Sequence, residues 1–321
     1  MLANKKILIT GASGFVGKHL VDKLLKTGSQ LASIDLVYDQ IFLEKYGEKV
    51  HLFSGNLLDK KFIAACIQNF TPDYVFHLAG SKSRTNSLAE FESSNEINYK
   101  GTLHLFEALI TCENLKLVTI VGTIEEYGST RSPFKEDSHE SPSSAYGLSK
   151  LAATKLAMIF YQQFNLPTLV LRPSIAYGPG QGEEMFIPAL IKTLLKQQPF
   201  KMTEGNQLRD FIFIDDLTDA LVNAAYCKGV DGNVVNIASG TSIKLKDIAL
   251  QIAEIINSKE NLKIGEVPYR SSEIMEYSVD ISKASLLLQW HPKTKLIDGL
   301  KNTIDFYQKN LLDEAKHTIL L

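Results

Sequence analysis

Short apolar runs alternate with longer amphipathic stretches through the first half of the chain. The runs are four to seven residues long and rich in Ile, Leu and Val, which is typical of buried strands. We predict strands at 6–9, 30–35, 50–53, 73–78, 115–121 and 168–171. The intervening pattern predicts helices at 15–26, 59–69, 95–111 and 145–164, the second of them capped by Asp59.

Strands that alternate with helices are joined by right-handed crossovers and form a parallel sheet. The predicted strands are apolar at nearly every position, which indicates a sheet covered on both faces. The sequence therefore predicts an α/β fold with a doubly wound parallel Rossmann sheet in residues 1–178.

The pattern changes after residue 178. Helical and extended segments follow in mixed order at 185–196, 211–214, 215–226, 234–237, 244–257, 264–267 and 305–321. This order does not simply extend the first sheet. We expect residues 179–321 to form mainly a smaller C-terminal α/β lobe, with some segments returning to the Rossmann domain.

A glycine-rich turn joins the first predicted strand to the first helix. It reads Thr10-Gly-Ala-Ser-Gly-Phe-Val-Gly17. Such glycines permit a tight turn, close approach of a pyrophosphate and close helix–strand packing, and the helix N-terminus supplies N–H donors. The turn predicts a dinucleotide site formed by Gly11, Ser13, Gly14, Phe15, Val16 and Gly17.

Asp35 ends the second predicted strand, eighteen residues after Gly17. A carboxylate there binds the adenosine ribose of NAD and repels the 2′-phosphate of NADP. We therefore predict NAD, with NADP as the alternative; a helix cap is the structural alternative for Asp35. Asn56 and Leu57 follow the third strand and could face the adenine, or form a turn and join the core.

Tyr146 and Lys150 lie four residues apart on the predicted helix at 145–164, so they share one face. An ammonium one turn away stabilises a phenolate, and a phenol that normally titrates near ~10 can then exchange protons at neutral pH. Thr123 follows the fifth strand. Together with the glycine-rich turn, these residues predict hydride transfer with tyrosine as the acid and base.

Composition narrows the class of protein. The 321 residues carry a net charge of −2, which gives no reason to expect nucleic-acid binding. No apolar run approaches the ~20 residues of a spanning helix, and the apolar stretch before Thr10 is too short for a signal peptide. Three widely spaced cysteines lack the spacing of a metal site. We expect a cytoplasmic protein with free thiols, no metal and no membrane partner.

Four segments in the first half resemble the extended short-chain dehydrogenase/reductase family, which contains nucleotide-sugar epimerases, dehydratases and reductases. Residues 10–17 match T-G-x-x-G-x-x-G, 77–80 match H-x-A-[AG], 146–150 match Y-x-x-x-K, and 172–178 match R-P-x-x-x-Y-G. In the second lobe, residues 209–216 resemble R-D-[FY]-x-x-V-x-D. The resemblance covers nearly the whole chain.

The resemblance implies roles for individual residues. Tyr146 would be the proton donor or acceptor, Lys150 would bind the nicotinamide ribose and lower the pKa of Tyr146, and Thr123 would hydrogen-bond the sugar. Further cofactor contacts would come from Leu78, Ala79, Gly80, Asn98 and Pro173. Corresponding helices in the family often pair between subunits, and apolar stripes at 103–109 and 150–160 lead us to expect a homodimer.

The implied substrate is a nucleotide-diphosphate sugar. The resemblance assigns Arg209 and Arg270 to the diphosphate, whose oxygens suit a guanidinium fork, and Glu273 to the nucleotide ribose. Gln181 would line the nucleotide pocket. Position alone adds Arg84 in the loop after the fourth strand, and Glu125 and Glu126 after Thr123, as candidate substrate contacts.

The residue after Thr123 bears on the reaction. Family dehydratases most often carry an acid or a serine there, whereas Ile124 can neither give nor take a proton; Glu125 remains. The run 125–128 is more similar to reductases of 4-keto-6-deoxy sugars. We predict reduction at C4 of an NDP-4-keto-6-deoxyhexose with Tyr146 as proton donor. The main alternative is an NAD-dependent 4-epimerase, followed by a 4,6-dehydratase and a non-catalytic NAD-binding sensor.

Overall fold

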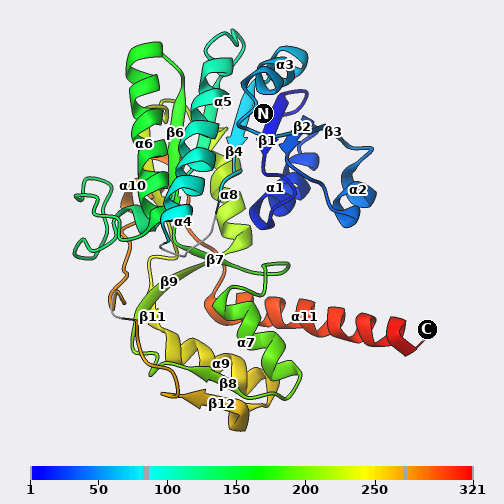
Figure 1. The fold of residues 1–321 in the computed structure, drawn as a ribbon, viewed down its shortest axis with the longest axis vertical. Helices are drawn as coiled ribbons and strands as arrows, with labels where there is room; N and C mark the ends of the chain where they lie inside the picture. Colours follow the sequence, from blue (N-terminus) through cyan, green and yellow to red (C-terminus); the bar gives the residue numbers. More distant parts are fainter. Residues whose placement is uncertain (1, 82–86, 271–272, 320–321) are drawn as a thin grey trace.

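A computed structural model of the protein describes residues 2–81, 87–270 and 273–319. Its central sheet contains β1 (Lys6–Thr10), β2 (Gln30–Asp35), β3 (Val50–Ser54), β4 (Tyr74–His77), β5 (Leu117–Val121), β6 (Thr168–Pro173) and β10 (Asn233–Ile237). Their order is β10-β6-β5-β4-β1-β2-β3, and every neighbouring pair is parallel. The strand order reverses beside β1, where ligands bind in such sheets. The predicted Rossmann fold class is confirmed (Figure 1).

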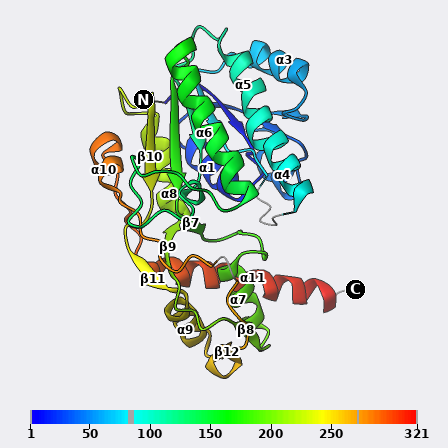
Figure 2. The ribbon, with the colours of Figure 1, turned by 60° about the vertical axis from the view of Figure 1, so that its left-hand side comes forward.

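Helices cover both faces of this sheet (Figures 1 and 2). One side carries α1 (Phe15–Leu25), α8 (Ile214–Ala224) and α10 (Ser282–Leu288), and the other α3 (Lys60–Phe70), α5 (Gly101–Leu109) and α6 (Ala145–Phe164). Strand side chains alternate between the two cores: Ile7 and Ile9 belong to the first and Leu8 to the second. Burial on both faces explains the continuous apolar runs in the sequence.

Local sequence explains where α3 begins and which of its faces is buried. On α3, Ile63, Ile67 and Phe70 form one buried stripe. The Asp59 carboxylate accepts the backbone N–H groups of Lys61 and Phe62 at 3.0 Å each, so the predicted cap is present. A cap of this kind stabilises a helix by about 1 kcal/mol.

The predicted helix at 95–111 is not one regular α-helix. It is divided into a π-helical segment η1 (Asn95–Lys100) and α5, and a separate helix, α4 (Leu88–Ser94), precedes it. The Thr102 hydroxyl donates a 2.5 Å hydrogen bond to the backbone oxygen of Asn98, inside the widened segment. Single π-helical turns inside α-helices often mark functional positions, and Asn98 is such a candidate.

The second lobe lies below the Rossmann sheet in Figure 1. It contains a three-stranded sheet of β7 (Ile175–Tyr177), β9 (Leu208–Phe213) and β11 (Ser242–Lys244), a parallel pair of β8 (Phe200–Met202) and β12 (Leu262–Ile264), and helices α7 (Phe186–Leu195) and α9 (Leu245–Ile256). Three segments beyond residue 178, namely β10, α8 and α10, pack with the Rossmann domain. The chain therefore crosses between the two parts several times.

The last helix, α11 (Leu296–Ile319), begins well before the predicted residue 305. Its first turns bury Leu300, Ile304 and Tyr307. Gly299 is required there, because an added Cβ would lie 2.2 Å from the Tyr177 hydroxyl. That glycine concealed the helical pattern in the sequence. Within the described residues, no helix combines the length and apolar character needed to cross a membrane.

Candidate active site

The glycine-rich turn packs backbone against backbone. Gly11 has φ +77°, and an added Cβ would lie 2.7 Å from the backbone nitrogen of Ala79 at the end of β4. An added Cβ at Gly17 would lie 2.2 Å from the backbone oxygen of Gly11. At Gly14 the nearest atom would be 3.3 Å away. Gly11 and Gly17 are therefore required by the fold, whereas Gly14 leaves space beside the turn.

The N-terminus of α1 is suited to bind an anion. Gly14 is its N-cap, none of the described side chains caps it, and no acidic residue occupies its first turn. The first N–H groups of a helix lack intrahelical partners and carry partial positive charge. Ser13, Phe15 and Val16 lie at this position, so the predicted pyrophosphate contacts surround an uncapped helix end.

Asp35 lies beside the same turn. Its carboxylate accepts hydrogen bonds from the Ala12 backbone N–H at 2.9 Å, the Ser13 hydroxyl at 2.8 Å and the Ser33 hydroxyl at 2.7 Å. Burial raises the pKa of Asp35, while the hydrogen bonds from Ser33 and Ser13 act in the opposite direction. Leu36 and Val37 follow, 67% and 71% exposed, and neither offers a cation to a 2′-phosphate. These residues fit NAD.

Asn56 and Leu57 occupy different environments. Asn56 is exposed, and its side-chain oxygen accepts the backbone N–H of Leu58 at 2.9 Å. Leu57 is buried in the core on the α3 and α5 side, where its side chain would contact a Cβ added to Gly101. For Leu57 the structure favours the core position over an open apolar shelf for adenine.

A directional hydrogen-bond chain joins the ends of β1 and β4 to helix α5. The Thr102 hydroxyl donates to the Asn98 backbone oxygen, so it must accept the 2.9 Å bond from Nε2 of His77. Nδ1 of His77 then accepts the 2.7 Å bond from the Thr10 hydroxyl, whose oxygen in turn accepts the Ala79 N–H at 3.2 Å. Burial, together with the Lys150 charge, lowers the pKa of His77 to about 3, so this imidazole is neutral.

Asn98 holds the backbone that follows β4. Its side-chain oxygen accepts the Ser81 N–H at 2.7 Å, and its amide donates to the Ser81 backbone oxygen at 3.2 Å and to the Ser149 hydroxyl at 2.8 Å. A Cβ added to Gly80 would lie 2.6 Å from the Asn98 side-chain oxygen and 3.8 Å from Nζ of Lys150. Gly80, Asn98 and Lys150 therefore converge.

Helix α6 presents Tyr146 and Lys150 one turn apart. The Ser144 hydroxyl caps this helix by accepting the Gly147 N–H at 3.0 Å. Tyr146 is half-buried, and Lys150 is buried. Burial lowers the pKa of Lys150 to about 8, against the opposing influence of the Glu126 charge. Among the residues that the structure describes, none forms a hydrogen bond or ion pair with the Lys150 ammonium, which leaves it available to a ribose.

Thr123 caps the short 3₁₀ helix η2 (Ile124–Glu126) at the end of β5. The Glu125 carboxylate, half-buried, is 3.4 Å from the Ser144 hydroxyl, and a Cβ added to Gly147 would lie 2.7 Å from the Glu125 backbone oxygen. The turn that Thr123 caps therefore packs against the start of α6, the helix that carries Tyr146. Ile124 is buried in an apolar cluster and supplies no proton-transfer group.

Glu126 does not lie where the sequence led us to expect. Its side chain is fully buried, and its carboxylate accepts the Thr123 backbone N–H at 2.9 Å and Nε of Arg172 at 2.8 Å. With both oxygens engaged and no exposed surface, Glu126 does not line a sugar pocket in this structure. It is part of the scaffold beneath Thr123.

In the second lobe, Arg209 and Glu273 form an ion pair. Nη1 of Arg209 also donates to the backbone oxygens of Leu208 and Ile274 at 2.7 Å each. Burial lowers the pKa of Arg209, while the charges of Glu273, Tyr277 and Glu125 act in the opposite direction. The guanidinium carbon of Arg209 lies 4.9 Å from the centre of the Tyr277 ring, which packs against the apolar cluster that contains Ile124, so the second lobe meets the Rossmann domain at this point.

Two further predicted substrate contacts, Gln181 and Arg270, differ in exposure. Gln181 is buried, and its amide donates to the backbone oxygen of Ala176 at 2.6 Å, so it acts first as a structural support. Arg270 is exposed. Arg84 lies outside the described residues. Pro173 ends β6, next to the β7 strand that leads into the second lobe.

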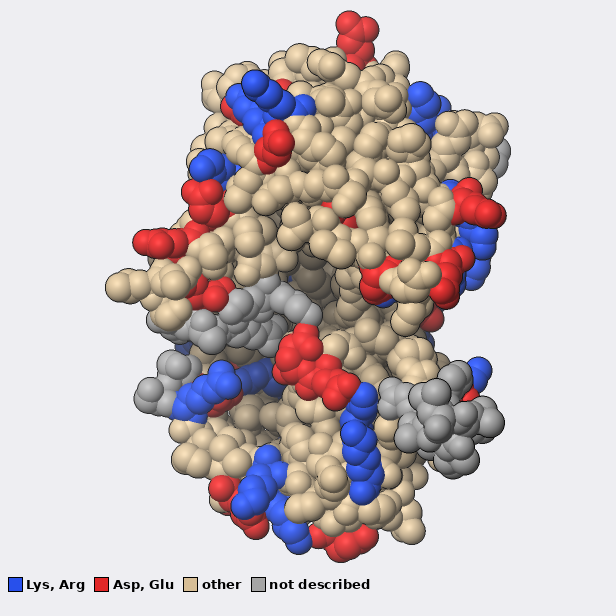
Figure 3. Space-filling model, turned by 45° about the vertical axis from the view of Figure 1, so that its right-hand side comes forward, with Lys and Arg blue, Asp and Glu red and all other residues tan. Residues whose placement is uncertain are grey.

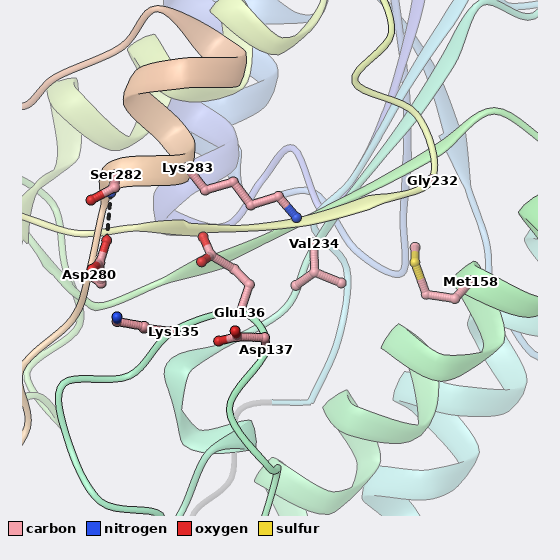
Figure 4. Close-up of a pocket in the computed structure, with 9 residues that line it drawn as sticks. All are labelled: Lys135, Glu136, Asp137, Met158, Gly232, Val234, Asp280, Ser282 and Lys283. Atoms are coloured by element: carbon pink, nitrogen blue, oxygen red, sulfur yellow. Dashed lines mark hydrogen bonds between the residues drawn. The ribbon is translucent and has the colours of Figure 1, made fainter.

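The molecular surface is hollowed between the Rossmann domain and the second lobe (Figure 3). A separate cavity of about 650 Å³ lies along the outer strand β10 and is lined by Lys135, Glu136, Asp137, Met158, Gly232, Val234, Asp280, Ser282 and Lys283 (Figure 4). Glu136 there accepts the backbone N–H of Asn236 at 2.8 Å. This cavity contains none of the predicted site residues and carries mixed charges, so it is distinct from the candidate active site.

Four of the residues that build this site have a supporting role that the sequence did not reveal. Ser33 supports Asp35, Ser149 supports Asn98, Thr102 supports His77, and Arg172 supports Glu126. Except for the pair at 33 and 35, each partner lies far along the chain, and only the fold brings the two together. Arg172 was part of a recognised segment, but its partner was not predictable from it.

Comparisons with known proteins agree with this geometry. Residues 7–238 match the model of the NAD dependent epimerase/dehydratase family. The chain is similar to the uncharacterized UDP-glucose epimerase YtcB of Bacillus subtilis (strain 168), with 31% identity over 317 residues, covering 94% of this chain and 97% of that protein.

Solved structures show the same likeness. Epimerase Mth375 from Methanothermobacter thermautotrophicus superimposes with a TM-score of 0.90 at 25% identity, covering 98% of this chain and 95% of that one. The UDP-glucuronic acid 4-epimerase from Bacillus cereus, solved with UDP-glucuronic acid and NAD, gives 0.87 at 29% identity, covering 95% and 99%.

Proposed function

This chain belongs to the NAD-dependent epimerase/dehydratase family, and we propose that it interconverts nucleotide hexoses that differ in configuration at C4. The observation that carries the proposal is the packing of the turn capped by Thr123 against the start of α6, the helix of Tyr146 and Lys150, in a chain whose dinucleotide turn is bonded to Asp35. A UDP-hexose is the proposed substrate class, because two of the three similar proteins named above carry UDP-sugars in their names.

The residues divide the work of such a reaction. NAD held at the glycine-rich turn would supply reversible hydride transfer at C4 of the sugar. Tyr146 takes the proton of the C4 hydroxyl as a general base and gives it back as a general acid. The Thr123 hydroxyl donates a hydrogen bond to the C4 oxygen, and the Lys150 ammonium stabilises the Tyr146 phenolate. Arg209 and Arg270 hold the diphosphate.

Reduction of a 4-keto-6-deoxy sugar, the reaction that the sequence alone favoured, is the second candidate. It would use the same three residues in one direction only, with Tyr146 protonating the new alkoxide. Its support was the resemblance of 125–128 to reductases. Glu126 of that run is buried, so Glu125, whose charge influences Arg209, is the only acid of the run that is half-buried. We therefore place the epimerase first.

Dehydration and a non-catalytic role have less support. A 4,6-dehydratase needs an acid to drive out the C6 hydroxyl, and Ile124 lies in an apolar cluster with Tyr127 and Phe134 instead. A cofactor sensor needs no proton relay, whereas this chain buries an amine at Lys150 at a cost in stability.

We also propose a homodimer in the cytoplasm. Large apolar side chains remain exposed on η1 and α6 and at the end of α5: Ile97, Tyr99, Ile110, Leu148, Ile159 and Phe164. Helices α5 and α6 lie side by side, so pairing with a second copy would bury these side chains in a four-helix interface. Cys66, Cys112 and Cys227 are all free, which suits a reducing compartment.

A coenzyme assay separates the two leading candidates. The pure enzyme is denatured to measure NAD(H) that it retained, and a second sample is mixed with NADH or NADPH and a panel of UDP-hexoses and 4-keto-6-deoxy sugar nucleotides. Retained NAD and conversion of UDP-hexoses without net coenzyme consumption supports the epimerase. Stoichiometric coenzyme oxidation by a keto sugar, with UDP-hexoses untouched, contradicts it and supports the reductase.

A further inference from the structure

Glu126 and Arg172 form an ion pair that has no contact with solvent. Nε and Nη2 of Arg172 both lie 2.8 Å from one carboxylate oxygen of Glu126, and the side chains of both residues are fully buried. Burying two charges is unfavourable unless their partners are well placed. A pair of this kind beneath a candidate active site therefore calls for a reason beyond stability.

The second oxygen of Glu126 supplies that reason. It accepts the Thr123 backbone N–H at 2.9 Å, and the Thr123 hydroxyl accepts the Glu125 N–H at 3.2 Å. These bonds form a capping box that fixes the Thr123 backbone at the end of β5. Gly122 makes the contact possible, because an added Cβ there would lie 2.5 Å from the Glu126 oxygen.

Arg172 is itself held on several sides. Its Nη2 donates to Glu140 at 3.0 Å, and its guanidinium carbon lies 4.7 Å from the centre of the Tyr127 ring. The Tyr127 hydroxyl donates to the Asn236 side chain at 2.7 Å, on strand β10. Burial alone would lower the pKa of Arg172, but Glu126 and Tyr127 raise it, so the guanidinium stays charged. Glu126 therefore rests on a rigid cation.

Glu126 lies on η2, and η2 packs against the start of α6, the helix that carries Lys150. Burial lowers the pKa of Lys150, and the negative charge of Glu126 opposes that effect. Within the described residues, His77 on β4 also faces Lys150 and is neutral, because burial holds its pKa near about 3; Tyr146 lies one turn away on the same helix. Removing the Glu126 charge would thus leave the ammonium without an opposing buried anion.

We propose that Glu126 is a positioning residue of the active site: through its bond to the Thr123 backbone and its pairing with Arg172, it fixes the Thr123 hydroxyl and keeps a buried negative charge near Lys150. Glu126 touches neither sugar nor cofactor. The inference deepens the proposed function and rests on it for the role of Thr123.

The first test titrates Lys150 directly. Lysine labelled with ¹³C at Cε is followed by NMR from pH 6 to 11 in the wild-type protein, and Lys150→Met assigns the signal. In Glu126→Gln, we expect the midpoint of Lys150 to fall by roughly one pH unit. Glu140→Gln is the matched control, because it removes the other carboxylate on Arg172 and leaves Thr123 untouched; its midpoint should not move. An unchanged midpoint in Glu126→Gln overturns the electrostatic part.

The second test measures epimerisation against pH. Glu126→Gln should lower kcat by about 10- to 100-fold with little change in KM, because a displaced Thr123 weakens only the transition state. The basic limb of its pH profile should move to lower pH, as the Lys150 midpoint does. A loss of the same size in Glu140→Gln, with an unshifted profile in both, would mean a merely structural role and overturn the proposal.

A companion variant guards against misfolding. Glu126→Gln leaves Arg172 as a buried charge, so the double change Glu126→Gln/Arg172→Met removes both charges at similar volume. It should fold and show a Lys150 midpoint below that of wild type, lowered by less than in Glu126→Gln because the Arg172 charge is removed as well; a wild-type midpoint in a folded double variant contradicts the inference. If wild type converts no UDP-hexose at all, the proposed function fails, while the NMR titration still decides the electrostatic role of Glu126.

Discussion

The backbone N–H of Ala12 donates a 2.9 Å hydrogen bond to the carboxylate of Asp35. This bond ties the end of β2 to the glycine-rich turn. Asp35 therefore shapes the turn, and we predict that it also selects the coenzyme.

Replacing Asp35 should weaken NAD binding and relax coenzyme choice. We expect Asp35→Ala to lower NAD affinity by about 10- to 100-fold, the loss of one or two hydrogen bonds to a charged group. Asp35→Ala/Leu36→Arg should bind NADP better than wild type does, because it removes the repulsion and adds a cation. Calorimetric titration with both coenzymes measures this.

Asp39→Asn is the control for Asp35. Asp39 lies four residues beyond Asp35, is exposed and pairs with Lys18. Its substitution should leave both affinities within about twofold of wild type. If Asp39→Asn and Asp35→Ala weaken NAD equally, the carboxylate of Asp35 is not the coenzyme contact.

The glycines of the turn should separate stability from affinity. Gly17→Ala would force a Cβ to within 2.2 Å of the Gly11 oxygen, so we expect it to lower the free energy of unfolding by about 1–3 kcal/mol. Gly14→Ala meets its nearest atom only at 3.3 Å and has φ −74°, so its stability should change by less than about 1 kcal/mol.

For Gly14→Ala, NAD affinity rather than stability should be affected. Its Cβ would enter the space beside the uncapped N-terminus of α1, and we expect NAD affinity to fall at least about tenfold while the protein stays folded. Denaturant unfolding and coenzyme titration of both variants decide the matter. A Gly14→Ala protein that binds NAD normally would contradict the placement of the pyrophosphate.

Lys150 should destabilise the coenzyme-free protein. Its pKa is about 8 in the folded protein against 10.5 for a free lysine, so the unfolded chain binds more protons between these values. Stability should therefore rise as pH increases from 8 to 10.5, and below pH 8 the full cost of burying the ammonium is present.

Removal of that amine should consequently stabilise the fold. We expect Lys150→Met to raise the free energy of unfolding by about 3 kcal/mol at pH 7, with a gap that narrows toward pH 10. Urea unfolding of the two coenzyme-free proteins at pH 7, 8, 9 and 10 measures the gap. A gap that is constant with pH would show that the amine does not bear a buried charge.

If the proposed dimer forms through α6, a charge introduced on the exposed side of this helix should prevent association. Ile159→Arg, on the exposed side of α6, should convert the protein to a monomer in sedimentation experiments. Leu286→Arg on α10 is the control, since Leu286 is also highly exposed but lies on another face of the sheet. Equal sedimentation of wild type and Ile159→Arg would remove α6 from the interface.

Much of the Rossmann domain was predictable because burial on both faces leaves a strong signal. The bounds of β2 and α6 agree with the sequence pattern at both ends. Elements of three residues, such as β7, are too short for any periodicity to register. The π-helical turn at Asn98 was missed because an added backbone residue shifts the helical period without changing the local composition.

The residues of the candidate site fall into the same two groups, those with a local sequence signal and those without one. Residues in local motifs, such as Tyr146 and Lys150, were found because their spacing itself has chemical meaning. The pairing of Glu126 with Arg172, 46 residues apart, depends on β5 and β6 being neighbours and on which way each side chain turns. A glutamate followed by a tyrosine gives no local sign of full burial, so the sequence suggested a pocket residue instead.

The measurement that tests the central claim most directly follows the hydrogen at C4. Wild-type protein is given a UDP-hexose deuterated at C4, without added coenzyme, and the product is examined by NMR. The account predicts the C4 epimer with deuterium retained at C4, no epimer from Tyr146→Phe, and normal conversion by Tyr161→Phe on the same helix. Loss of the deuterium to solvent, or full activity of Tyr146→Phe, would contradict it.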